Sequence, residues 1–354
     1  MPISPATLLN QIFQEANDQE ASDIHLLAFM PPYIRVDGAL RPLVGYEALS
    51  DKQLQDMGFA ILRADQRDRF TESREMDIAY QTPDATRYRV NLHWEKNTVA
   101  LAARIISSKI PTMSELNLPQ IVYDLIKKPA GLVLVTGPTG CGKSTTLASL
   151  IESINIERAE HIVTLEDPIE FVYQSKKSLI AQRQLGVDMA NFQDGLKHVL
   201  RQDPNVILVG EMRDPETIAM TITLAETGHL VFATLHTYNA PQTIDRIIDT
   251  FPPYQQTQVR LQLSITLQGV ISQRLLPKVG GGRVAAREVL INNPAIGNLI
   301  RENKMAQMKT VMQTSADEGM VTMDQNLARL YREGKIVRED AITFMDNPMI
   351  LEKK

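Results

Sequence analysis

The stretch GPTGCGKSTT, from Gly137 to Thr146, constrains the fold more than any other part of the chain. It satisfies the pattern G-x-x-x-x-G-K-[ST], in which a glycine-rich turn joins a strand to a helix and cradles phosphate groups. The apolar segment LVLVT precedes it, and the helical pattern KSTTLASLIESI follows it. The stretch therefore predicts a strand, a phosphate-binding loop and a helix within an α/β domain.

The same loop predicts which atoms would hold a triphosphate. Its glycines allow backbone N–H groups to turn toward the phosphates, and the helix N-terminus adds positive potential. Lys143 would reach the β- and γ-phosphates, and the Ser144 hydroxyl would bind Mg²⁺. The alternative is a chance match in a glycine-containing turn, and the flanking strand and helix argue against it. The residues expected to bind the nucleotide are Gly137, Pro138, Thr139, Gly140, Cys141, Gly142, Lys143, Ser144 and Thr145.

A single cysteine and a slightly acidic charge balance exclude several classes of protein. Cys141 alone can form neither an internal disulfide nor a four-cysteine zinc site, so we expect no zinc. With 37 basic and 42 acidic residues the net charge is −5, which gives no broad attraction to nucleic acid. No apolar run approaches the roughly 20 residues that a membrane span needs. We therefore expect a cytoplasmic protein with no nucleic-acid partner.

The pattern of apolar residues divides the chain into four segments. Residues 1–108 combine an opening amphipathic helix with alternating strands, as in a small α+β domain. Residues 109–120, KIPTMSELNLPQ, contain two prolines and no strong periodicity, which predicts a linker. Residues 121–292 alternate strands with helices, and residues 293–354 are helical in pattern. The predicted fold class is α/β, with an α+β domain before the phosphate-binding core and a helical cap after it.

The strands of the core are near-continuous apolar runs that alternate with helical patterns. Such runs suit strands covered on both faces, so they predict a mainly parallel sheet wrapped by helices. Beyond them, the spacing predicts a long helix from Tyr254 to Leu276 and then a strand pair around GGGRVAAREVLI. The four apolar runs are 132–136, 161–165, 206–210 and 230–235.

Ionisable residues directly follow three of these runs. Glu166 and Glu170 follow the second run, Glu211 follows the third and His236 follows the fourth. Ligands of open α/β sheets bind beyond the carboxyl ends of the strands, so we expect these side chains near the phosphates. Glu211 is the first candidate for Mg²⁺ support and water activation, while Glu166 and Glu170 compete for the role of general base. The alternative is that these acids cap helices or pair with arginines.

Two histidines flank the fourth apolar run. If the residues between them form a strand, His229 and His236 lie roughly 20 Å apart, at about 3.3 Å per residue. A metal ion shared by the two is therefore not expected. His236 lies at the phosphate end and is a candidate to contact the γ-phosphate. His229 lies at the opposite end, where it is a candidate for either a catalytic or a structural role.

Several stretches in fixed order carry a resemblance to a known family. LEDPIEF, VILVGEMRD, ETGHLVFATLHT and DRIIDTFPP resemble the Asp box, Walker B and His box of the secretion and pilus ATPases. These are the additional-strand-catalytic-glutamate branch of RecA-like motors. The similarity spans essentially the whole chain, from ASDIHL to AIGNLIRE. Within the family, the chain is most similar to the ATPases that retract type IV pili in twitching motility.

The resemblance implies a fold, an assembly, an activity and a set of partners. It implies a PAS-like N-terminal domain, a RecA-like ATPase core and a ring of six identical chains that hydrolyses ATP with Mg²⁺. Hydrolysis would drive rigid-body movements that pull pilin subunits back into the inner membrane. The implied partners are the inner-membrane platform protein of the pilus, on which the ring docks peripherally, and a paralogous accessory ATPase. In that family ATP binds between the domains, and both histidines belong to the His box.

Arginines of the N-terminal domain close over the nucleotide in that family. The matching segment here is TRYRVNLHWEKNTVALAARII, so the candidates are Arg87, Arg89 and Arg104. Strand alternation places Arg87 and Arg89 on one face. The alternative is that all three lie on a solvated face of a sheet.

The segment AIGNLIRE, residues 295–302, resembles a retraction-associated motif of the same family. Its apolar residues fall on one helical face and can anchor it. This leaves Asn298, Arg301 and Glu302 for contact with a partner. Gly297 departs from the usual arginine and weakens the helix by about 1 kcal/mol relative to a good helix former.

Other functions remain to be weighed against a retraction motor. A nucleotide-gated accessory subunit of a pilus or type II secretion ATPase would have little turnover of its own, although the sequence lacks none of the catalytic carboxylates. A nucleic-acid motor is disfavoured by the acidic balance. A small-molecule kinase does not account for the long N-terminal domain or the two histidines.

The first prediction concerns catalysis by the isolated chain. The purified protein should hydrolyse ATP in the presence of Mg²⁺. Lys143→Ala or Glu211→Ala should abolish turnover, because each removes a group expected to neutralise charge or activate water at the γ-phosphate. A phosphate-release assay measures this effect. Robust turnover in both variants would remove the mechanism.

Overall fold

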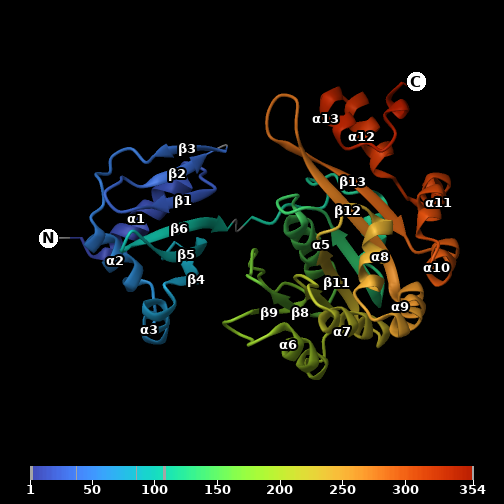
Figure 1. Cartoon of the computed structure of the whole chain (residues 1–354), viewed down its shortest axis with the longest axis horizontal. Coiled ribbons are helices and arrows are strands. Elements are labelled where there is room, and N and C mark those ends of the chain that lie inside the picture. Colours follow the sequence, from blue (N-terminus) through green and yellow to red (C-terminus); the bar gives the residue numbers. More distant parts are fainter. Residues whose placement is uncertain (1–2, 37, 85, 107–108, 353–354) are drawn as a thin grey trace. The chain divides into compact units, whose positions relative to one another are not determined.

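A computed structural model describes residues 3–36, 38–84, 86–106 and 109–352. The chain forms two compact units, residues 1–109 and 110–354 (Figure 1). The mixed α/β fold predicted from the sequence is confirmed. Among the described residues, no helix is both long enough and apolar enough to cross a membrane.

The first unit is a six-stranded antiparallel sheet with helices α1 (Pro5–Asp18), α2 (Asp51–Ala60) and α3 (Ala64–Ser73). The strand order is β3-β2-β1-β6-β5-β4. Its core joins Leu9 and Phe13 of α1 to Tyr88 and Val90, all fully buried. The strands are β1 (Asp23–Leu26), β2 (Tyr33–Val36), β3 (Ala39–Pro42), β4 (Glu75–Gln81), β5 (Arg87–Glu95) and β6 (Thr98–Ile106).

The second unit is built on a seven-stranded sheet with the order β13-β12-β7-β11-β10-β8-β9. All neighbouring strands in it are parallel except β12 and β13, which form an antiparallel hairpin. The carboxyl ends of β7, β8, β10 and β11 therefore lie at one edge, as the apolar runs predict. The strands are β7 (Gly131–Thr136), β8 (His161–Glu166), β9 (Leu179–Gln184), β10 (Val206–Val209), β11 (Leu230–Leu235), β12 (Leu267–Pro277) and β13 (Arg283–Ile291).

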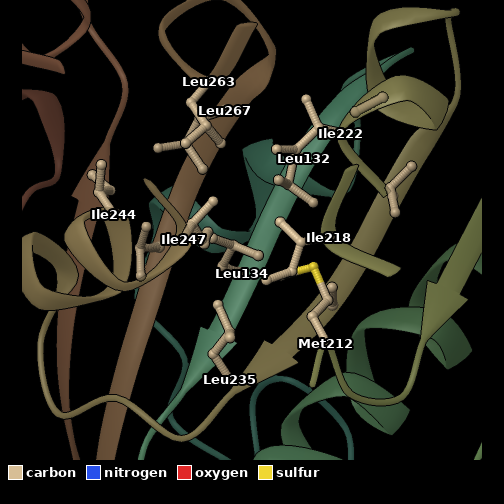
Figure 2. Close-up of a cluster of buried hydrophobic side chains, with 14 of the residues drawn as sticks. Leu132, Leu134, Met212, Ile218, Ile222, Leu235, Ile244, Ile247, Leu263 and Leu267 are labelled. Atoms are coloured by element: carbon tan, nitrogen blue, oxygen red, sulfur yellow. The ribbon is translucent and has the colours of Figure 1, made fainter. Parts of the chain in front are cut away.

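Helices cover both faces of this sheet. On one face α4 (Gln120–Leu125) and α5 (Lys143–Glu157) pack on Val133, Val135 and Phe232. Figure 2 shows the other face, where Leu132 and Leu134 of β7 lie against side chains of the covering helices. Burial on both faces explains why these strands are apolar at nearly every position. The helices that contribute to the second face are α6 (Phe192–Val199), α7 (Pro215–Glu226), α8 (Ala240–Asp249) and α9 (Pro253–Thr266).

The long helix predicted from Tyr254 to Leu276 is wrong in its second half. Helix α9 ends at Thr266, and Leu267–Pro277 is strand β12, paired in parallel with β7. Gly269 allows β12 to lie close to β13 and α4, because a Cβ there would lie 2.9 Å from the Leu290 carbonyl oxygen and 3.1 Å from Leu125. The apolar residues of the segment fit a helical period as well as a buried strand, and pairing with β7 decides between the two.

The segment predicted as a linker, 109–120, lies largely within the second unit. Met113 and Leu118 are buried in the core that also holds α5, and the Leu116 carbonyl accepts a hydrogen bond from Arg287 Nη1 at 2.8 Å. Ser108, the predicted end of the first domain, lies outside the described residues. The part of this segment that packs on the core therefore belongs to the second unit.

The C-terminal region contains α10 (Pro294–Arg301), α11 (Met308–Thr314), α12 (Met323–Arg332) and α13 (Arg338–Thr343). In α10, Ile296, Leu299 and Ile300 are buried, as predicted for the anchoring face. Gly297 is buried as well, and a Cβ there would lie 3.2 Å from the Ser264 carbonyl oxygen of α9. The glycine thus allows two helices to approach closely, a constraint that helix propensity alone does not reveal.

The second prediction concerns this contact. Alanine should stabilise a helix by roughly 1 kcal/mol relative to glycine. Gly297→Ala should yield less than that or destabilise the protein, because its Cβ presses on a backbone carbonyl that cannot rotate away. Chemical unfolding of the full chain measures the effect, with Asn298→Ala, exposed on the same helix, as the control. A full gain of about 1 kcal/mol in Gly297→Ala would contradict the close contact.

Candidate nucleotide-binding site

The glycine-rich loop needs its glycines for two separate reasons. Gly137, Gly140 and Gly142 have φ of 143°, 78° and 87°, a region that other residues rarely adopt. Gly137 also faces strand β12, where a Cβ would lie 2.3 Å from the Gln273 carbonyl oxygen and 2.6 Å from Cys141 Sγ. No side chain fits there, so the loop lies directly against β12.

Helix α5 begins at Lys143, immediately after the loop. Its N-cap is Gly142, which has no side chain to accept hydrogen bonds from the first turn. Ser144 and Thr145 lie in that first turn, and both are partly exposed. The free N–H groups and the positive end of the helix dipole together form a site suited to phosphate.

Gln273 of β12 braces the loop and was not identified from the sequence. Its Nε2 donates to the Cys141 carbonyl at 2.8 Å, and its Oε1 accepts from Thr146 Oγ1 at 2.9 Å. The side chain is almost fully buried. A polar pair, Ser272 and Gln273, within an apolar segment was the available signal, but the helical interpretation of that segment hid it.

Lys143 lies over the loop, in reach of the carboxylates that follow the strands. Its Nζ donates to the carbonyls of Gly137 at 2.8 Å and Pro138 at 3.2 Å. Burial lowers the pKa of the ammonium, and the charges of Glu211 and Glu170 act in the opposite direction. Acids that follow two different strands, β10 and β8, thus act on the charge of this lysine.

Glu211 and His236 lie together at the same edge as the loop. Glu211 Oε1 lies 3.3 Å from His236 Nε2, and His236 Nδ1 lies 3.4 Å from the Thr139 hydroxyl. Arg213 binds the other carboxylate oxygen of Glu211 at 2.9 Å and reaches Asp167 at 3.5 Å. Residues from β10, β11 and the loop therefore form one connected polar group.

Backbone contacts fix the turn that carries Glu211. The Gly210 N–H donates to the Leu165 carbonyl at 2.8 Å, and the Met212 N–H donates to the Thr234 carbonyl at 3.2 Å. These bonds tie the end of β10 to the ends of β8 and β11. The carboxylate is thus positioned by the sheet rather than by a mobile loop.

Glu166 is the most buried acid at this edge. Its Oε1 accepts from Thr164 Oγ1 at 2.6 Å and from Gln182 Nε2 at 3.1 Å. Burial raises the pKa of this carboxyl, and the charge of nearby Glu170 raises it further. Glu170 itself is exposed. A carboxylate with a raised pKa takes up a proton more readily than an ordinary carboxylate, which is a property of general bases.

His229 is not brought to this group within the chain. It lies before β11, at the opposite end of that strand from His236. Its Nδ1 lies 2.9 Å from the Leu224 carbonyl and 3.2 Å from the Thr227 hydroxyl, at the C-terminal end of α7. Within the chain, its contacts are those of a residue that caps a helix.

The three candidate arginines share one face of the sheet in the first unit. Arg89 pairs across the strands with Arg104, and Arg87 lies two residues earlier on β5. Arg104 Nε binds Asp23 at 2.9 Å, and Arg89 Nε lies 3.9 Å from Asp77. These ion pairs are exposed and therefore weak.

The residues predicted for partner contact lie on the exposed side of α10. Asn298 Nδ2 donates to Glu302 Oε1 at 3.0 Å, and Arg301 lies 3.4 Å from both Asn298 and Ser264 Oγ. Their side chains thus bind one another across one turn of helix, while the apolar residues of α10 face inward.

Comparison with known proteins places this arrangement in a family. The family model for the type II/IV secretion system protein matches residues 3–342. The type IV pilus retraction ATPase PilT of Pseudomonas aeruginosa is 49% identical over 91% of this chain and 94% of its own length. The twitching motility protein of Neisseria gonorrhoeae is 48% identical over 91% of this chain and 86% of its own. A crystal structure of the pilus retraction motor PilT with bound ADP superposes with a TM-score of 0.92 at 46% identity, over 98% of this chain and 99% of that one.

The third prediction tests the brace on the loop. Gln273→Leu leaves the Cys141 carbonyl and the Thr146 hydroxyl without their partner, at about 1 kcal/mol for each lost hydrogen bond. We expect ATP affinity to fall roughly tenfold because the loop is no longer held in its binding conformation. Fluorescent-nucleotide titration measures this change. Ser272→Ala, which removes a hydroxyl bonded to Thr136 rather than to the loop, is the control. Equal affinity in both variants would refute the brace.

The fourth prediction follows from the raised pKa of Glu166. The folded protein holds this proton more tightly than the unfolded chain, so the free energy of unfolding falls as pH rises from about 4.5 through the raised value. Glu166→Gln keeps both hydrogen bonds to Oε1 and removes the charge. Its melting temperature should therefore exceed that of the wild type at pH 8, and the difference should shrink as pH falls. Glu47→Gln, at an exposed position in the other unit, is the control. A less stable Glu166→Gln protein at pH 8 would contradict the account.

Proposed function

The chain belongs to the type II/IV secretion system protein family, and from that premise we propose that it is the Mg²⁺-dependent ATPase that powers retraction of type IV pili. The substrate is ATP, and its hydrolysis is coupled to movement of a pilus. The ring contains six copies of the chain and acts on the cytoplasmic side of the inner membrane. Its partner there is the platform protein of the pilus, and a paralogous ATPase is a further partner.

One observation supports this function above the others. The phosphate-binding loop, Glu211 and His236 reach the same edge of the sheet and contact one another through Thr139. An inert nucleotide switch needs only the loop. A carboxylate and an imidazole fixed beside it are the groups that hydrolysis requires.

The residues would act on the bound nucleotide as follows. The first turn of α5 binds the β-phosphate through its N–H groups, and Lys143 turns from the loop carbonyls to the γ-phosphate. Ser144 and Glu211 supply oxygen atoms of the kind that Mg²⁺ prefers. Bound Mg²⁺ would neutralise charge on the phosphate oxygens. His236, whose Nε2 lies 3.3 Å from Glu211, would contact the γ-phosphate.

Activation of the attacking water requires a carboxylate at the same edge. Glu211 is the proposed base, and its contact with Arg213 orients it. Glu166 and Glu170 remain alternatives for this role, and buried Glu166 would accept a proton more readily than an exposed acid. Arg87, Arg89 and Arg104 are proposed to reach a nucleotide when the ring closes, with Arg89 and Arg104 exchanging their weak ion pairs for phosphate contacts. His229 is proposed to act at a contact between neighbouring copies rather than on the nucleotide of its own chain.

Coupling to a pilus is proposed to use the exposed side of α10. Asn298, Arg301 and Glu302 present both charges and an amide on a helix anchored by buried residues. A low-turnover accessory subunit is the alternative function. The assembled catalytic group argues against it, because such a subunit has no need of an activated carboxylate.

The fifth prediction separates these functions in cells. In a strain lacking the gene, labelled pili should grow but not shorten, and the wild-type chain should restore shortening. Glu211→Gln should leave the protein folded and restore none, since it removes the base while keeping the shape of the side chain. Arg338→Gln, at an exposed position away from the loop, is the matched control and should restore shortening. Loss of pilus growth in the deletion strain would instead assign the chain to extension.

A further inference from the structure

A cavity lined by several charged residues lies away from the nucleotide loop, within the same unit. It has a volume of about 270 Å³ and is formed by the turn end of the β12–β13 hairpin, helix α12 and residues 115–119. We call it the hairpin cavity. A second hollow of about 380 Å³ adjoins it and shares Asn117, Pro119, Arg329 and Lys335. Neither includes a residue of the nucleotide loop or the acids beside it.

Arg287 is the most unusual residue of the hairpin cavity. Its side chain is only 5% exposed, yet no carboxylate lies within ion-pair distance among the described residues. Nη1 donates to the Leu116 carbonyl at 2.8 Å, while the buried Nε has no acceptor in the described structure. Burial, together with the charge of Arg329, lowers the pKa of this guanidinium to about 10. A buried cation normally has an anionic partner, because desolvating an unpaired charge is costly.

The other charged residues of the cavity are also mostly basic. Besides Arg287, its lining includes Lys278, Arg283, Arg329 and Lys335, against the single acid Glu115. Glu333 at the rim binds Lys335 at 2.7 Å and lies 3.8 Å from Arg329, which satisfies part of this charge. Lys278 and Arg283 form no ion pair among the described residues. The cavity therefore has a net positive charge with a buried arginine in its wall.

The hairpin register connects this cavity to the nucleotide loop. Arg287 on β13 is the direct cross-strand partner of Gln273 on β12. Cross-strand partners project on the same face of a sheet, so the two side chains are neighbours. Gln273 braces the loop through Cys141 and Thr146. A charge bound at Arg287 would therefore lie one strand away from the brace of the nucleotide loop.

We propose that the hairpin cavity is a second anion site, which binds a small ligand through a phosphate group. A phosphate offers several acceptor oxygens to the fixed donors of a guanidinium, including the Nε that lacks a partner. The volume is below that of ordinary drug-sized pockets, so it suits a phosphate or pyrophosphate group better than a whole nucleotide. The lysines and arginines at the rim would complete the binding of charge.

Calorimetric titration of the full chain with inorganic pyrophosphate tests this site. Saturating Mg·ADP keeps the nucleotide loop filled, and repeating the titration with Lys143→Ala removes that loop as a competitor. We expect one saturable site in both experiments. Lys278→Gln/Arg283→Gln should weaken pyrophosphate binding at least tenfold. Lys128→Gln/Arg201→Gln, which changes the net charge equally at exposed positions outside the cavity, should leave it unchanged.

Two further titrations test the same site, one with a variant of Arg287 and one with a different anion. Arg287→Met, which keeps a long buried side chain, should abolish binding. If that variant does not fold, the Lys278→Gln/Arg283→Gln variant still tests whether the cavity binds pyrophosphate. Succinate should bind more weakly than pyrophosphate, because a carboxylate offers fewer oxygens to the guanidinium. The proposal is overturned if no saturable site appears with the loop filled, if the rim variant binds as the wild type does, or if succinate binds as tightly as pyrophosphate.

Discussion

The close approach of Gly137 to strand β12 is the contact on which the rest of the site depends. A carbonyl of β12 occupies the space that a side chain would need, and Gln273 from the same strand binds the loop at two points. These contacts hold the loop to the sheet through the protein's own groups. Because β7, β10 and β11 belong to the same sheet, the loop has a fixed position relative to the acids that follow those strands. Preorganisation of this kind spares the site the cost of ordering itself during the reaction.

Electrostatics at this edge follow from how deeply each group is buried. Glu166 is enclosed, which raises its pKa, whereas Glu211 is held in a network with Arg213 and His236. Two carboxyl groups with such different environments can take different roles in a reaction. Lys143 is bonded to carbonyls of the phosphate-binding loop, and the charge of Glu211 acts on it. The order of the strands thus decides which acids lie at this edge of the sheet, and their different burial gives them different environments.

Much of this arrangement could be predicted from the sequence, because buried strands have a recognisable pattern of apolar residues. Strands covered on both faces are apolar throughout, and the glycine pattern identifies the loop between β7 and α5. The parallel topology then brings the carboxyl end of each strand to one edge. The sequence alone therefore predicts that Glu211 and His236 lie at that edge. Family resemblance supplied the remaining roles, which residue patterns alone left open.

Three features could not be found in this way, each for a physical reason. Leu267, Val270, Ile271 and Leu275 have helical spacing, so β12 was interpreted as a helix and Gln273 was missed. Helix propensity alone predicts that Gly297 weakens its helix. The nearby Ser264 carbonyl oxygen, which leaves little room for a Cβ, cannot be recognised from the sequence. The position of Arg287 opposite Gln273 depends on the register of a hairpin, which the sequence of one chain does not encode in a readable pattern.

The most direct test of the central claim is a structure of the assembled protein with Mg²⁺ and a non-hydrolysable ATP analogue. The account predicts that Ser144 and Glu211 bind the same metal ion, directly or through one water, with His236 in hydrogen-bond contact with the γ-phosphate. It is contradicted if Glu211 and Glu166 both face away from the nucleotide in every copy of the chain.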